Sequence, residues 1–101
     1  MTDKAKDLQC LITLSQAMLE KAREDSWDDV VNLEAERSGL IELFFLESVQ
    51  EEYAEMVAGG IRAILAMDID IMELGTLKKL DIVQILQKME MGKKVVQAYG
   101  S

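Results

Sequence analysis

Histidine and proline are both absent from this chain, and cysteine occurs once. Without histidine, catalytic triads, the Glu-x-x-His di-iron sites of helical bundles and haem ligation through imidazole are all excluded. A single cysteine can form neither an internal disulfide nor a zinc site. No Gly-rich phosphate-binding loop is present either. We therefore expect no catalytic residue, no cofactor and no metal site, and we predict that the protein is not an enzyme.

Glycine is also scarce, with six residues in 101, whereas half of the residues are apolar. The lack of proline and the abundance of Leu, Met, Glu, Lys and Ala let helices run without interruption. A chain of this length forms one domain with one modest core. We predict an all-α fold over residues 1–101, an antiparallel bundle of four helices whose C-terminal helix can move.

Long apolar runs are missing too, so no membrane insertion is expected. The segment Met1–Asp7 alternates charges where a signal peptide would be hydrophobic, which predicts a cytoplasmic protein. The net charge of −8 disfavours direct nucleic-acid binding and suits solubility or basic partner proteins. Cys10 lies in an apolar helical pattern, which predicts a buried or half-buried thiol without a reactive role.

Apolar residues recur at three- and four-residue steps along most of the chain, which predicts helices. Ser26 can cap a helix start, and Asp28 and Asp29 suit its first turn. Gly75 is a typical helix end, and Thr76 can cap the helix that follows. We predict helices over about 3–24, 27–48, 51–74 and 77–91, followed by a short tail over 92–101.

Three charged residues fall within otherwise apolar arcs of the helical wheels: Glu34, Arg37 and Asp68. A charge that faces a core needs a partner. We predict a structural charge cluster in which Arg37 bridges Glu34, one turn earlier, and Asp68 on the neighbouring helix. Such a cluster adds little net stability but fixes the register of one helix against the next.

The predicted third helix has a second apolar stripe besides its core stripe, formed by Ile61, Leu65, Ile69 and Met72. So wide an apolar arc must be covered on two sides. The predicted fourth helix has a stripe that fits this face, formed by Ile82, Ile85, Leu86 and Met89. Two interpretations stay open: an ordinary four-helix core, or a latch helix that gives way when a partner binds the helix-three stripe. Gly59-Gly60 indicates a close helix contact or a bend.

Several short patterns occur together in a fixed order. They are Leu33-Glu34 with Arg37 and Leu40, Ile64-Leu65 with Asp68, Ile71 and Leu74, and the closing run Gly92-Lys93-Lys94-Val95-Val96-Gln97-Ala98-Tyr99. With these patterns the chain resembles the FliT family of flagellar export chaperones. The resemblance covers most of the chain and is strongest over Trp27–Phe44 and Ile64–Leu74.

The resemblance implies a cytoplasmic chaperone that binds the flagellar filament-cap protein before its type III export. It also implies that the last helix folds over the partner-binding surface and is displaced on binding. Further partners implied for the family are components of the export ATPase complex and a flagellar master transcriptional regulator. Two alternatives stay open: a purely structural homodimer, and a regulator that sequesters an activator without any export role.

Overall fold

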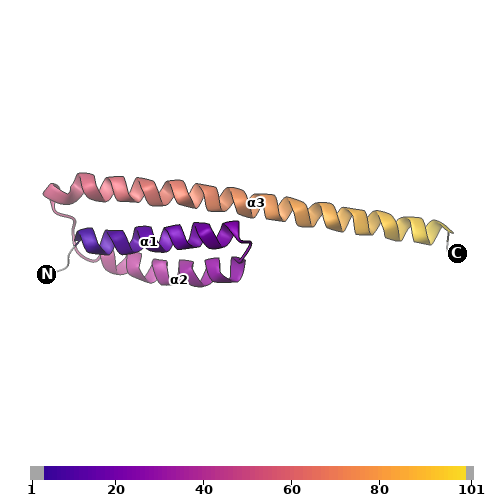
Figure 1. Cartoon of the computed structure of the whole chain (residues 1–101), viewed down its shortest axis with the longest axis horizontal. Helices are drawn as coiled ribbons and strands as arrows, with labels where there is room; N and C mark the ends of the chain where they lie inside the picture. Colours follow the sequence, from indigo (N-terminus) through magenta and orange to yellow (C-terminus); the bar gives the residue numbers. More distant parts are fainter. Residues whose placement is uncertain (1–3, 100–101) are drawn as a thin grey trace.

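The computed structural model describes the backbone of residues 4–99 and the side chains of residues 4–89. Along the chain follow α1 (Lys4–Arg23), α2 (Trp27–Phe44), the short 3₁₀ helix η1 (Glu51–Tyr53) and α3 (Ala54–Tyr99). α1 and α2 form an antiparallel hairpin, and α3 runs along it and then far beyond it (Figure 1). The molecule is therefore elongated, with extents of 74 × 20 × 20 Å.

The predicted helical class is confirmed for the described residues, but the prediction of four helices is wrong. α3 continues through Gly75 and Gly92 as one helix of 46 residues. No described glycine has a positive φ, so Gly75 does not end a helix. Thr76 does not cap a new one, because its hydroxyl donates a hydrogen bond back to the Met72 carbonyl at 3.0 Å within the same helix. The predicted tail is helical as far as Tyr99, and residues 100–101 lie outside the described part.

Gly75 lies inside α3, beside the indole ring of Trp27. A Cβ atom built at Gly75 would lie 3.6 Å from the ring of Trp27, at the start of α2. This is an ordinary van der Waals distance, so a small side chain would fit at position 75 and the packing does not require glycine there.

α2 begins at Trp27, as predicted, but the turn between α1 and α2 is built differently. Asp25 has a φ of 63°, and the amides of Asp25 and Ser26 donate to the carbonyls of Ala22 and Lys21. These two bonds are the Schellman pattern that ends α1. The Ser26 side chain makes no capping hydrogen bond. At its other end α2 stops at Phe44, before the predicted limit near residue 48.

The core consists of two clusters along the bundle, and α1 contributes to both. The first contains Leu8, Leu11, Phe44, Val57 and Ile64, and the second contains Met18, Leu19, Ala22, Val30 and Ile71. α1 packs along both α2 and α3, whereas α2 and α3 meet mainly through long side chains. α1 is thus the central helix of the bundle.

Arg37 on α2 makes the main polar contact with α3. Its guanidinium forms two hydrogen bonds to the Asp68 carboxylate, at 2.7 and 3.2 Å. It also donates to the hydroxyl of Ser15 on α1 at 3.1 Å, and that hydroxyl in turn donates to the Leu11 carbonyl. The Arg37 side chain is 10% exposed and that of Asp68 28% exposed.

The expected membership of Glu34 in this cluster is wrong. Glu34 is exposed, and it forms no ion pair with Arg37 among the described residues. The guanidinium already donates two hydrogen bonds to Asp68 and one to Ser15. The Glu34 carboxylate, on the same helix as Arg37, remains in water and therefore has no desolvation penalty. The bridge therefore joins all three helices, through Ser15, Arg37 and Asp68.

We expect Arg37→Met to lower the free energy of unfolding by about 2–4 kcal/mol, because it leaves Asp68 without its partner in a partly desolvated site. Urea unfolding followed by far-UV circular dichroism measures the change. Glu34→Gln is the matched control and should stay within about 0.5 kcal/mol of the wild type. Equal losses in the two variants would contradict the assignment of the bridge.

Gly60 lies where α3 comes closest to α1. A Cβ atom built there would lie 2.6–2.8 Å from three carbons of the Leu8 side chain, which is itself buried in the core. At Gly59 the nearest such atom belongs to the Arg62 side chain, at 4.0 Å. Of the two adjacent glycines, only Gly60 is required by the packing.

Gly60→Ala should therefore lower the free energy of unfolding by about 1–2 kcal/mol, since overpacking outweighs the gain in helix propensity. Gly59→Ala should raise it by up to about 1 kcal/mol, because only the propensity term acts there. Thermal and urea unfolding of both variants test the pair. A stabilising Gly60→Ala would show that Leu8 moves aside freely.

Candidate protein-binding surface

The predicted partner-binding stripe lies along the part of α3 that packs on the hairpin, and most of it faces solvent. Leu65 is 54% exposed, Ile69 56% and Met72 70%. Ile61 differs, because it is half-buried against the first core cluster. The open surface therefore begins at Leu65 and continues toward the C-terminal end of α3.

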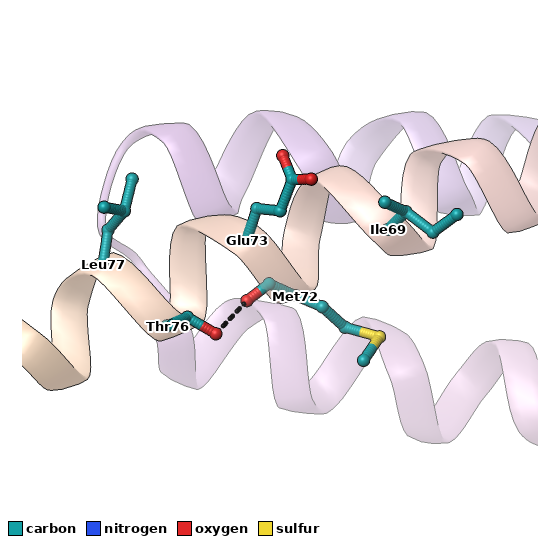
Figure 2. Close-up of a pocket in the computed structure, with 5 residues that line it drawn as sticks. All are labelled: Ile69, Met72, Glu73, Thr76 and Leu77. Atoms are coloured by element: carbon teal, nitrogen blue, oxygen red, sulfur yellow. Dashed lines mark hydrogen bonds between the residues drawn. The ribbon is translucent and has the colours of Figure 1, made fainter.

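A shallow apolar hollow lies at the C-terminal end of this stripe. Its lining residues all come from α3 and are Ile69, Met72, Glu73, Thr76 and Leu77 (Figure 2). The Thr76 hydroxyl donates to the Met72 carbonyl, so it is held against its own helix. The surface of the hollow is therefore mostly apolar. Ile69 and Met72 lie about 60° apart around the helix and can together receive an apolar side chain of another protein.

The predicted latch residues Ile82, Ile85, Leu86 and Met89 lie further along the same helix and are all exposed. Their expected packing over the helix-three stripe is wrong, because residues 77–91 continue α3 in a straight line (Figure 1). A segment of the same straight helix cannot fold back on residues 61–72. We call residues 78–99 of α3 the overhang, since α1 and α2 do not reach along it.

A polar clip joins the hairpin turn to α3 where the overhang begins. Lys78 forms an ion pair with Asp25 at 2.8 Å, and the indole Nε1 of Trp27 donates to the same carboxylate at 2.8 Å. The hydrogen bond from Lys78 lowers the pKa of Asp25, and the bond from Trp27 acts in the same direction. Asp25 in turn raises the pKa of Lys78.

A second apolar hollow lies between the start of α1 and the end of α2. It measures about 420 Å³ and is lined by Asp7, Cys10, Leu40, Leu43, Phe44, Leu46 and Glu47. Cys10 is exposed at this site, so the expectation of a buried or half-buried thiol is wrong. Lys4 lies nearby, with its ammonium over the Phe44 ring and a hydrogen bond to the Phe44 carbonyl. Lys4 thus holds the start of α1 to the end of α2.

The described residues offer little chemistry beyond these apolar surfaces. No group of His, Cys, Asp and Glu among them could hold a metal ion. No helix in the described part of the chain is long and apolar enough to cross a membrane. Every buried polar side-chain atom that the structure describes has a hydrogen-bond partner. What this geometry provides is exposed apolar surface on a rigid helical scaffold.

Comparison with protein families gives a match over nearly the whole chain. The model described as flagellar protein FliT matches residues 5–101. The chain belongs to the FliT family of flagellar proteins. Searches among curated proteins and among solved structures give no match. The match includes the hairpin, the exposed stripe of α3 and the overhang of this FliT-family chain.

Sequence reasoning missed two parts of the surface in this FliT-family chain. Leu77 and Thr76 were assigned to the start of a separate helix, although both line the same hollow as Ile69 and Met72. The helical period did not give Leu77, because it follows Met72 by five residues and lies about 140° around the helix from it. The hollow beside Cys10 could not be found in this way, because it depends on how α1 and α2 meet.

The clip predicts a specific pH response. Since the pKa of Asp25 is lowered in the folded protein, its contribution to stability is present above the ordinary aspartate pKa and is lost as the pH falls through the lowered value. Lys78→Gln should move the pKa of Asp25 back toward its ordinary value, as measured by NMR titration of the side-chain carboxyl carbon. Lys79→Gln is the matched control. An unchanged Asp25 pKa in Lys78→Gln would rule out the clip.

Proposed function

We propose that this FliT-family chain is a cytoplasmic export chaperone without enzymatic activity. It holds the flagellar filament-cap protein before that protein passes through the type III export apparatus. The match to the flagellar family over residues 5–101 supports the proposal, together with one observation. That observation is the exposed apolar stripe on α3 formed by Leu65, Ile69 and Met72.

The stripe has the properties expected of a site for an amphipathic helix. Anchor residues on such a ligand recur at three- and four-residue steps, and Leu65, Ile69 and Met72 have the same spacing. Met72 is unbranched and adapts to differently shaped partners. Glu73 is exposed and lies one turn after Ile69 on α3, which favours partners with basic residues beside their apolar anchors.

A rigid scaffold is useful for this task. The stripe lies on the part of α3 that the core clusters and the Arg37–Asp68 pair hold in place. A partner that binds here need not order the chaperone, so less of the binding free energy is lost to ordering. Because no covalent chemistry takes part, the cap protein can be released intact when the export apparatus takes it over.

We extend the proposal to the other partners that the resemblance implies, components of the export ATPase complex and a flagellar master transcriptional regulator. The charge distribution favours basic partners, because residues 1–77 carry six Lys or Arg against 17 Asp or Glu. A DNA-binding regulator has the basic surface that such a body attracts. A regulator that sequesters an activator without any export role is therefore the second candidate.

Titration calorimetry of the filament-cap protein from the same organism into the full-length chain tests the first proposal. Leu65→Asp and Met72→Asp should each weaken binding by about 30-fold or more, since each places a charge in a desolvated contact. Ala63→Asp is the matched control, because this exposed residue lies on the opposite flank of α3. It should bind like the wild type.

The result also separates the two candidate functions. Binding of the cap protein that depends on Leu65 and Met72 supports the chaperone. If the folded wild-type chain does not bind the cap protein, the chaperone proposal is wrong. Binding of the transcriptional regulator in the same assay would then support the second candidate. Loss of cap-protein binding in Ala63→Asp as well would show that the stripe is not the specific site.

A further inference from the structure

The hollow between the start of α1 and the end of α2 differs in construction from the hollow in Figure 2. The lining residues of the latter come from α3 alone, whereas three segments of chain enclose the former. We call it the α1–α2 hollow. It can surround a side chain of another molecule on more than one side. It is lined by Asp7 and Cys10 of α1, by Leu40, Leu43 and Phe44 of α2, and by Leu46 and Glu47 beyond the end of α2.

Two leucines of the α1–α2 hollow are left in water. Leu43 is 63% exposed and Leu46 77%, whereas Phe44 between them is buried in the core. Leucine gains free energy when it leaves water, so these two side chains add little to the stability of the bundle as it stands. Neighbouring apolar side chains that stay exposed are typical of binding sites on soluble proteins.

The walls of the α1–α2 hollow are held in place by the rest of the bundle. Phe44 packs in the first core cluster with Leu8 and Leu11 of α1. The Lys4 ammonium lies 4.3 Å from the centre of the Phe44 ring and donates to the carbonyl oxygens of Phe44 and Glu47. Little binding free energy is therefore lost to ordering these walls when a partner enters.

The surroundings of the α1–α2 hollow are acidic. Residues 4–10 and 38–52, the two stretches that form it, together carry five Asp or Glu against two Lys, a formal charge of −3. Two of the lining residues are carboxylates, and none is Lys or Arg. The last turn of α2 contains no basic residue, so the partial negative charge of that helix end adds to the carboxylates. This charge favours a partner that carries Lys or Arg beside its apolar anchors.

The α1–α2 hollow is separate from the other apolar surfaces of the chain. It lies at the end of the bundle where α1 begins, whereas the overhang leaves the bundle at the opposite end and points away (Figure 1). The stripe on α3 is distant as well. Gly60 of α3 lies beside Leu8, and Met72 follows Gly60 by 12 residues, about 18 Å along the helix.

We propose that the α1–α2 hollow binds an amphipathic helix of another protein, with Leu-like anchors on one face and Lys or Arg beside them. A groove between two antiparallel helices fits a third helix. The anchors pack against Leu43 and Leu46, and the basic residues lie near Asp7 and the glutamates that follow α2. The proposal does not rest on the chaperone function, because the hollow shares no residue with the stripe. The chain can therefore hold this partner and the cap protein at the same time.

Alkylation of Cys10 by iodoacetamide tests the proposal on the full-length chain, because Cys10 lines the hollow and is the only cysteine. The probe is a cysteine-free peptide of about 18 residues, with Leu on one helical face and Lys on the other. Saturating peptide should slow the alkylation at least about 10-fold, since the bound helix covers the thiol. A matched peptide with Glu in place of Lys should give no protection at the same concentrations.

Three variants locate the bound peptide. Leu43→Gln should raise the peptide concentration for half protection at least about 10-fold, because it removes an apolar anchor without adding a charge. Val31→Gln is the matched control, since Val31 is 64% exposed on the same helix but does not line the hollow. It should behave like the wild type, and so should Leu65→Gln on the stripe. Far-UV circular dichroism checks that each variant is folded.

Four results would overturn the proposal. Cys10 may not stay fully reactive in saturating peptide, and equal losses in Leu43→Gln and Val31→Gln would show that binding does not depend on the hollow. Protection that Leu65→Gln removes and Leu43→Gln leaves intact would place the peptide on the stripe. Protection that appears without peptide as the concentration of the chain rises would show that a second copy fills the hollow.

Discussion

The bridge from Arg37 to Asp68 determines how the three helices stand relative to one another. Apolar packing between α1 and its two neighbours is strong but has little direction, so it would tolerate a shift of one helix along another. The guanidinium tolerates no such shift, because it bonds the Asp68 carboxylate on α3 and the Ser15 hydroxyl on α1 at once. The contact of Gly60 with Leu8 adds a steric limit. Together they fix which side of α3 faces outward.

The charge pattern on the helical wheels identified the main part of this bridge. It could show that Arg37 and Asp68 needed partners, because both fall in apolar arcs. It could not choose Ser15 over Glu34, since that choice depends on whether α1 or water lies beside the guanidinium. The prediction of four helices was wrong for a related reason. Gly75 and Thr76 are residue types typical of a helix break, but α3 continues through Gly75 without a positive φ, and the Thr76 hydroxyl bonds back to the Met72 carbonyl.

The candidate surface was predictable in part as well. The period of the sequence placed Leu65, Ile69 and Met72 on one stripe, and the structure leaves all three exposed. The same period assigned Ile61 to that stripe, although the position borders the core. A helical period gives the direction of a side chain around its own helix. It does not give the width of the neighbouring helix, which decides where burial ends.

The junction between body and overhang holds the single tryptophan of the chain. The Trp27 ring lies beside Gly75 on α3, and its indole nitrogen donates to Asp25, which in turn pairs with Lys78. An indole is fluorescent, and its emission depends on its hydrogen bonds and on its contact with water. The protein therefore contains an intrinsic optical probe at the place where the compact bundle passes into the exposed arm. Any partner that bends or releases α3 at this point changes the light that the molecule emits, without an added label.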